Sequence, residues 1–136
     1  MLLETIGLFA VAALLGSMLF FPSVVAPTVF RSLGPADAGK FLRTLFPAYY
    51  AFIIIASLVG AAALFNQTTL SLILAAILLS TLAVRQILVP KINAWRDMEL
   101  NGDSAAAARF KSGHRVSVLI NLVQMAAVFW VLWKLV

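Results

Sequence analysis

Residues Phe110–Val136 read FKSGHRVSVLINLVQMAAVFWVLWKLV, a stretch that is apolar and long enough to cross a bilayer as a helix. Polar residues nevertheless recur along it at intervals of three, four and three: His114, Ser117, Asn121 and Gln124. At about 100° per residue, these positions fall within an arc of about 80° on an α-helix. Because polar side chains that face lipid are costly, we expect this polar stripe to face other helices or a small hydrated cavity.

The composition supports a membrane environment for the whole chain. Its 136 residues are 63% hydrophobic and only 11% charged, which is more apolar surface than a soluble domain of this size can bury. The sequence contains no cysteine, which excludes disulfides, iron–sulfur clusters and thiolate metal sites. We therefore predict an all-α integral membrane protein.

The apolar runs and the residues that interrupt them predict a single four-helix transmembrane domain over residues 1–136. Pro22 and Pro27 remove backbone donors and should kink or break the first helix in its second half. Pro47 suits the first turn of the second helix, so the amphipathic stretch before it is expected to form a short interfacial helix. The four transmembrane helices are expected at about 3–30, 47–65, 70–100 and 104–135.

Two pairs of small residues predict close contacts between helices. Ala12 and Gly16 lie on one side of the first helix, and Ala56 and Gly60 lie on one side of the second. Small side chains at this spacing allow neighbouring helices in a membrane to approach closely. We therefore expect both pairs to lie at helix–helix interfaces.

Basic residues are concentrated in or beside the first and third connections between helices, and only Lys134 lies at the other end. Under the positive-inside rule both connections are cytoplasmic and both termini lie outside, which in a bacterium places the protein in the inner membrane. The net charge of +5 is then expected to engage anionic lipid head groups rather than nucleic acid. The other nine of the ten basic residues are Arg31, Lys40, Arg43, Arg85, Lys91, Arg96, Arg109, Lys111 and Arg115.

This orientation brings several polar residues together in the inner-leaflet half of the membrane, and we interpret them as a weakly polar ligand pocket. Ser, Asn and Gln side chains also commonly serve only as hydrogen-bond links between helices. An interpretation without a ligand is also open for Arg85, because its long side chain can extend its charge to the membrane interface instead of pairing inside the bundle. Both interpretations remain open at this point. The candidate residues are Tyr50, Arg85, Gln86, His114, Ser117 and Asn121.

Several chemistries find no support in the sequence. The five carboxylates lie in connections or at helix ends, so none is placed to transfer protons within the membrane. His114 is the single histidine, and without cysteine or an embedded acid it cannot form a closed zinc site. Two histidine ligands to haem would require a symmetric dimer, so cofactor and metal stay unassigned. No third residue completes a catalytic triad with Ser117 and His114, so the sequence gives no support for enzymatic activity and leaves the question open.

Three motifs resemble a known family. The segments FPAYY at 46–50, RQILVPKINAWRD at 85–97 and ARFKSGHRVSVLINLVQ at 108–124 are similar to the transmembrane protein 205-like family, known in bacteria as a domain of unknown function. The resemblance covers nearly the whole chain and implies a four-helix integral membrane protein. Eukaryotic members are linked with platinum-drug resistance and trafficking, but this chain lacks their longer connections. The positions that match recurring residues of the family, which add Asn93 to the candidate site, are Pro47, Tyr50, Pro90, Asn93, Arg96, His114, Ser117 and Asn121.

The sequence leaves three classes of function open. The first is a non-enzymatic protein that binds or passes a small solute, ion or lipid group at the inner-leaflet pocket. Transport would require a homo-oligomer, because four short helices enclose little volume. The second is an accessory or scaffold subunit of a larger membrane complex, whose polar stripe links helices or binds a membrane-protein partner. The third is a haem- or metal-linked membrane protein.

Overall fold

The computed structural model describes the whole chain, residues 1–136. It contains helices and no strands, and four continuous helical rods are each long and apolar enough to cross a membrane. The predicted fold class, an all-α architecture of four transmembrane-type helices, is therefore confirmed. The helices are α1 (Leu2–Phe20), η1 (Phe21–Val25), α2 (Ala26–Ser32), α3 (Pro35–Ala63), α4 (Thr68–Ala83), η2 (Val84–Leu88), α5 (Val89–Leu100) and α6 (Ser104–Leu135).

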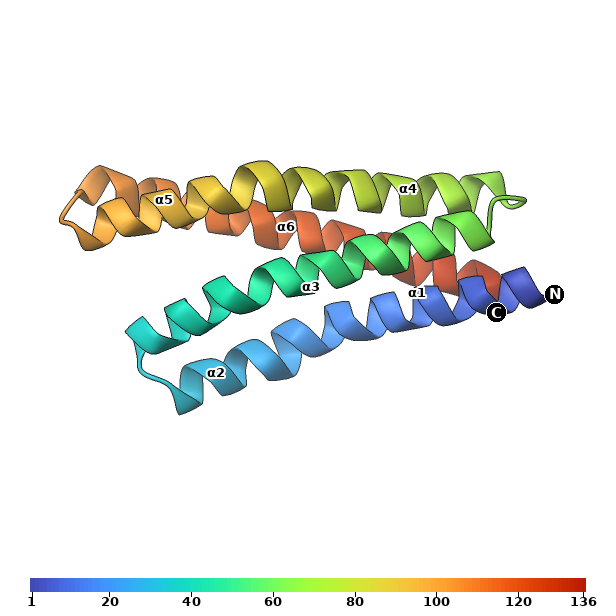
Figure 1. Cartoon of the computed structure of the whole chain (residues 1–136), viewed down its shortest axis with the longest axis horizontal. Helices are drawn as coiled ribbons and strands as arrows, with labels where there is room; N and C mark the ends of the chain where they lie inside the picture. Colours follow the sequence, from blue (N-terminus) through green and yellow to red (C-terminus); the bar gives the residue numbers. More distant parts are fainter.

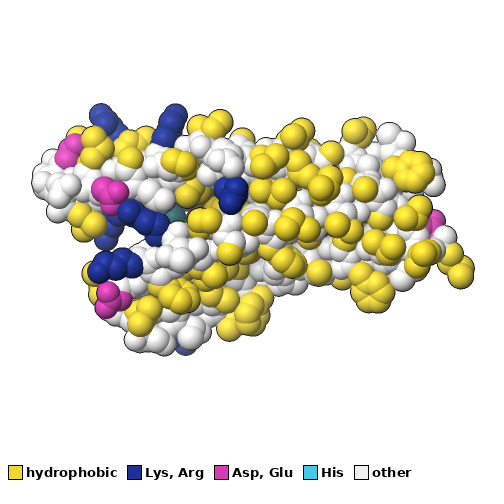
Figure 2. All heavy atoms as spheres, in the orientation of Figure 1, with side chains coloured by type: hydrophobic (Ala, Val, Ile, Leu, Met, Phe, Trp, Pro, Cys, Tyr) yellow, Lys and Arg dark blue, Asp and Glu magenta, His cyan; other side chains and the backbone are white.

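The four rods run antiparallel to their neighbours along one axis (Figure 1). Both termini and the connection from α3 to α4 lie at one end of the bundle, which we call the terminal end. The connections from α2 to α3 and from α5 to α6 lie at the opposite end. Lys and Arg side chains gather at this opposite end (Figure 2), and we call it the basic end.

The interior of the bundle is apolar and closely packed. The helix α3 packs along both α1 and α4, and α1 also packs along α6. Fully buried side chains from these helices, including Leu14, Ile53, Leu74 and Val128, meet in one continuous core. The outward faces carry exposed apolar side chains along the length of the bundle, as expected where lipid is the solvent.

The first rod is not broken at its prolines, contrary to one outcome expected from the sequence. It passes through the π-helical turn η1, in which the Ala26 amide donates to the Phe21 carbonyl five residues earlier. Pro27 follows directly. The third rod repeats this arrangement, because η2 ends at Leu88 and only Val89 separates it from Pro90. Proline cannot donate to the carbonyl four residues before it, and a π-turn shifts the pairing locally so that helical geometry continues on both sides.

The second rod corrects the prediction of a separate interfacial helix followed by a helix that begins at Pro47. The helix α3 instead runs without interruption over Pro35–Ala63, with Pro47 in its interior. An internal proline removes one hydrogen bond, here the one to the Arg43 carbonyl, and this loss does not end a helix whose two halves are both held by packing. Ala38 and Leu42, before the proline, are buried inside the protein rather than spread on a membrane surface.

The small residues behave differently in the two predicted pairs. Ala56 and Gly60 are both buried, and a Cβ built on Gly60 would lie 3.0 Å from a methyl carbon of Leu74 on α4. The prediction of close approach at this pair is confirmed. The prediction for Ala12 and Gly16 is wrong within one chain, because both are exposed and a Cβ on Gly16 would meet nothing within 4 Å. Periodicity alone does not reveal which side of a uniformly apolar helix meets a neighbour.

The turn into α6 forms as the sequence indicates. Gly102 has a φ of 97°, which favours glycine, and it follows Asn101 in the turn after α5. The side chain of Asp103 accepts hydrogen bonds from the Ala105 and Ala106 amides and caps the new helix. This tight connection holds α5 and α6 together as a hairpin at the basic end.

Gly113 provides a test of the packing between α5 and α6. A Cβ at this position would lie 2.7 Å from Cζ3 of Trp95 and 3.0 Å from Cγ1 of Ile92, so Gly113→Leu should force the two helices apart. We expect a loss of about 1–3 kcal/mol of stability, typical of overpacked interiors, measured by thermal unfolding of detergent-purified protein. Gly16→Leu is the matched control and should leave stability unchanged or slightly higher. Equal losses for both variants would contradict the observed packing.

Candidate functional site

The deepest member of the polar stripe, Gln124, links α6 to α4. Its amide nitrogen donates to the Ser80 hydroxyl at 2.7 Å and to the Thr81 hydroxyl at 3.1 Å. Gln124 and Thr81 are buried, and Ser80 is half-buried. These bonds satisfy an amide that would otherwise be costly in an apolar interior, so Gln124 acts as a structural link between helices.

The next member, Asn121, links α6 to α3. Its amide nitrogen donates to the Tyr49 hydroxyl at 3.3 Å, and the Tyr49 ring stacks on Phe21 of η1 with centroids 4.3 Å apart. Tyr49 therefore joins the first, second and fourth rods at one level of the bundle. Tyr50, the candidate beside it, is buried and packs its ring near Phe46 and Tyr49, with no hydrogen bond to its hydroxyl.

The last two members of the stripe make no side-chain hydrogen bond to another helix. Ser117 is buried, but its hydroxyl donates to the His114 carbonyl within α6 at 2.7 Å. The His114 ring is exposed and stacks on Phe110, with 6.2 Å between centroids. The Arg96 guanidinium covers the same Phe110 ring at 5.3 Å. The stripe thus changes along α6 from paired, buried side chains to an accessible imidazole at the basic end.

The candidates on the third rod are divided between the interior and the surface. Arg85, in the π-turn η2, is half-buried, and its Nε lies 3.4 Å from the Pro47 carbonyl of α3. Its two terminal nitrogens make no hydrogen bond within the chain. Gln86 is exposed and is not brought to the other candidates. Asn93 is half-buried, and its backbone carbonyl accepts a hydrogen bond from Arg43 on α3.

At the basic end the bundle divides into two hairpins, and Figure 2 shows a notch between them that opens at this end. The α2–α3 hairpin forms one side and the α5–α6 hairpin the other, since α3 does not pack along α5. In Figure 2 the single histidine, coloured cyan, is visible between the two sides. We define the notch by Arg43, Asn93 and Asp97, which are in contact across it, by His114, and by Tyr49 and Asn121, whose hydrogen bond links α3 to α6 deeper in the bundle.

One ion pair crosses the notch. The Arg43 guanidinium donates to both carboxylate oxygens of Asp97, at 2.9 Å and 3.3 Å, and to the Asn93 carbonyl at 3.2 Å. The side chains of Arg43 and Asp97 are 40% and 56% exposed, so the ion pair contributes only about 0–1 kcal/mol to stability. A contact this weak connects the two hairpins without locking them together.

Helical geometry places His114 and Arg43 at similar depth in the notch. His114 precedes Asn121 by seven residues, so it lies on the side of α6 from which Asn121 reaches α3, about 10 Å nearer the basic end. Arg43 precedes Tyr49 by six residues, which places it about 9 Å nearer the same end along α3. His114 on α6 and Arg43 on α3 therefore lie at similar depth, both nearer the basic end than the Tyr49–Asn121 hydrogen bond.

Sequence reasoning missed several of the partners that decide these roles. Arg43 and Asp97 were read only as part of the charge distribution, because their pairing joins positions 54 residues apart. Ser80 and Thr81 gave no signal within an apolar helix. Ser57 on α3 is fully buried, and its hydroxyl has no hydrogen-bond partner in the structure.

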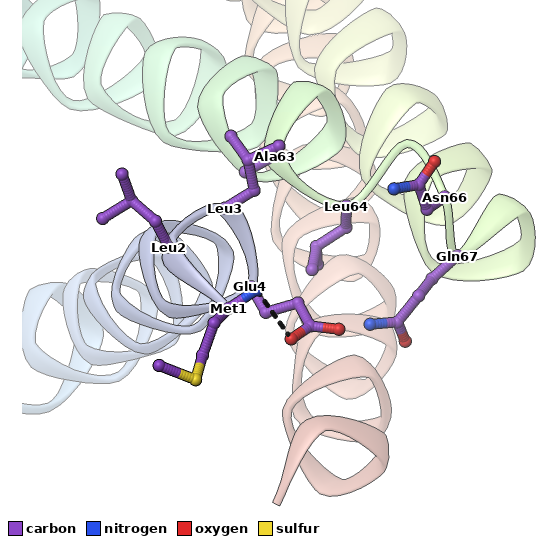
Figure 3. Close-up of a pocket in the computed structure, with 8 residues that line it drawn as sticks. All are labelled: Met1, Leu2, Leu3, Glu4, Ala63, Leu64, Asn66 and Gln67. Carbon is purple, nitrogen blue, oxygen red and sulfur yellow. Dashed lines mark ion pairs between the residues drawn. The ribbon is translucent and has the colours of Figure 1, made fainter.

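A separate hollow at the terminal end, of about 210 Å³, does not gather the candidate residues (Figure 3). Its lining is largely apolar, and its one carboxylate, on Glu4, pairs with the Met1 ammonium at 3.5 Å. An adjacent hollow of about 300 Å³ includes Lys134. No group of three or more His, Cys, Asp or Glu side chains comes together anywhere in the chain to hold a metal ion.

Four long apolar helices with polar residues paired between them define an integral membrane protein. The chain belongs to the family described as domain of unknown function DUF4149, whose model matches residues 9–101. An uncharacterised family of membrane proteins was expected from the sequence, and this broader statement is confirmed. The narrower resemblance to the transmembrane protein 205-like family is not confirmed by this match. No curated protein and no solved structure matches the chain.

The hydrogen bonds of Gln124 can be tested by a matched pair of serine variants. Ser80→Ala removes a hydroxyl that accepts from Gln124, whereas Ser57→Ala removes a hydroxyl without a partner. We expect Ser80→Ala to lower thermal stability in detergent and Ser57→Ala to preserve or raise it. In a double-mutant cycle, Gln124→Leu and Ser80→Ala should show a coupling of about 0.6–1.7 kcal/mol. A coupling of zero would mean that Gln124 does not link the helices.

Proposed function

We propose that this chain is a small, non-enzymatic protein of the bacterial inner membrane that binds a small solute, ion or lipid group in the notch at its basic end. The observation that carries the proposal is the contrast along the bundle. The deep polar residues Gln124 and Asn121 are paired with other helices, whereas the His114 ring is exposed and bonds no other helix where the hairpins separate. An accessible imidazole beside a hollow between helices is a feature typical of a binding site.

Binding is favoured over passage through a single chain. The middle of the bundle is filled by fully buried apolar side chains, among them Leu14, Ile53 and Leu74. A solute held in the notch would therefore meet a packed core rather than a path to the terminal end. Transport would need a second copy of the chain to form a pathway along an outer face.

The orientation of the bundle follows from its charges and is also part of the proposal. The two connections at the basic end would face the cytoplasm, and both termini and the α3–α4 connection would face outside. Reporter fusions inserted near Gly34 and Gly102 should therefore score as cytoplasmic. Fusions near Asn66 and at the C-terminus should score as external. A cytoplasmic C-terminus would invert the orientation and place the notch at the outer leaflet.

His114→Ala tests whether the notch has a binding role. Because the ring is exposed and bonds no other helix, we expect the folded yield and thermal stability to remain nearly unchanged. The amount of small molecule or lipid retained through purification, measured by mass spectrometry, should fall several-fold. Arg115→Ala is the control, since Arg115 is an exposed neighbour on the opposite side of α6 from Ser117 and Gln124.

Three results would argue against this role. Loss of stability in His114→Ala would mean that the imidazole holds the fold together. Stoichiometric co-purification of the wild-type chain with another membrane protein, without any retained small molecule, would favour a scaffold subunit. A haem or metal absorption band in the purified protein would favour the redox class instead.

A further inference from the structure

We propose that the hairpin formed by α2 and the first part of α3, residues 26–46, is a lid that opens and closes the notch. It swings about the level of the bundle at which Phe21, Pro47 and Arg85 lie, and the Arg43–Asp97 ion pair holds it closed. Such a lid goes beyond the binding role proposed above, and its motion does not depend on what the notch binds. Three features of the structure support it: interrupted helices at one level, sparse packing beyond that level, and a weak contact across the notch.

The first feature is that three of the four rods lose regular helical hydrogen bonds at one level. The first rod passes through the π-turn η1, the third rod passes through the π-turn η2, and Pro47 removes one bond inside α3. Contacts between these segments show that they lie side by side. The Phe21 ring of η1 stacks on Tyr49 with centroids 4.3 Å apart, and the Arg85 Nε of η2 donates to the Pro47 carbonyl at 3.4 Å. Prolines and π-turns are the places where helices bend, so we call this level the hinge.

The two hairpins at the basic end are attached to the hinge differently. Both rods of the α2–α3 hairpin are interrupted there, at η1 and at Pro47. In the other hairpin only η2 is interrupted, since α6 runs as one α-helix over Ser104–Leu135. The helix α5 also fits closely against α6, because a Cβ on Gly113 would lie 2.7 Å from Cζ3 of Trp95. The α2–α3 hairpin is therefore the half that moves, and the α5–α6 hairpin is the fixed wall.

The second feature is the sparse packing of the α2–α3 hairpin beyond the hinge. No residue of η1 or α2 is buried. Ala38 and Leu42 of α3 are buried, but neither belongs to the continuous apolar core, whose first buried member on α3 is Tyr50. Segments with few buried contacts open at a lower free energy than the core to which they are attached. The hairpin can therefore move without unpacking the rest of the bundle.

The third feature is the contact that holds the hairpin against the fixed wall. Arg43 donates to both carboxylate oxygens of Asp97 and to the Asn93 carbonyl. No other hydrogen bond or ion pair joins residues 26–46 to α5 or α6. The Arg43 and Asp97 side chains are both exposed, so water competes for this contact. Its loss frees the hairpin to swing at the hinge and widens the approach to His114, which lies at similar depth on α6.

Spin labels test the lid directly, because the chain contains no cysteine and two introduced cysteines carry the only labels. Lys40→Cys with Lys111→Cys places one label on α3 and one on α6 across the notch, both at exposed positions. Leu58→Cys with Phe129→Cys places a matched pair on the same two helices in the packed half of the bundle. With the whole chain in lipid nanodiscs, pulsed electron–electron double resonance should give a distance distribution at least about twice as wide across the notch as for the packed pair.

Further variants, each made in both labelled pairs, assign the motion to the hinge and to the ion pair. Arg43→Gln and Asp97→Asn break the ion pair from opposite sides, and each should move the cross-notch distribution to longer distances by several ångströms. Pro47→Ala restores an amide that can donate to the Arg43 carbonyl, and should narrow the distribution towards that of the packed pair. Arg31→Gln removes a charge from the same hairpin where no ion pair exists, and should change nothing. Pro35→Ala is the control for Pro47→Ala, because a proline in the first turn of α3 removes no helical bond.

Several results would overturn the lid. A cross-notch distribution as narrow as that of the packed pair would show that the hairpin is fixed. Equal shifts for Arg43→Gln and Arg31→Gln, or no narrowing by Pro47→Ala while the packed pair is unchanged, would remove the ion pair or the hinge from the account. A mobile hairpin in a protein that retains no small molecule would support the lid and remove the binding function. A fixed hairpin with a retained molecule that depends on His114 would do the reverse.

Discussion

The structure depends on the requirement that backbone amides and carbonyls be paired within the chain, because a bilayer offers no water to replace a missing partner. Helices meet this requirement locally, and the chain devotes nearly all its residues to four of them. Its prolines are accommodated under the same constraint. Two of them follow π-turns, and Pro47 is retained inside α3, so each rod remains continuous. Turns are confined to the two ends of the bundle.

Once the rods are continuous, the contacts between them determine which parts are rigid. At the terminal end and in the middle, buried apolar side chains and the bonds of Gln124 hold the helices together. Toward the basic end, the Tyr49–Asn121 bond is the last link between α3 and α6, and beyond it the hairpins separate. Charged side chains favour this separation, since they are stable where water or lipid head groups reach them.

The change from a packed core to separated hairpins is the structural basis of the proposed binding site. A fully packed bundle would leave only a lipid-facing surface, whereas separated hairpins create a hollow with charged walls at the boundary of the apolar layer. The weak ion pair between Arg43 and Asp97 keeps the two walls near each other without filling the space between them. His114 belongs to this region, and the buried members of the same polar stripe support the fold beneath it.

The amino-acid sequence by itself determined the number and approximate course of the helices, since apolar length and turn residues are local properties. It also determined that a polar stripe runs along the last helix and that basic residues occupy one end. Only the tertiary structure decided that Gln124 and Asn121 are paired, that His114 is open, and that Gly16 packs against nothing while Gly113 packs against Trp95. The physical reason is that periodicity indicates a face of a helix, whereas the partner on that face depends on residues far away in the chain. The Arg43–Asp97 pair joins residues 54 positions apart, and no local pattern in either helix records that contact.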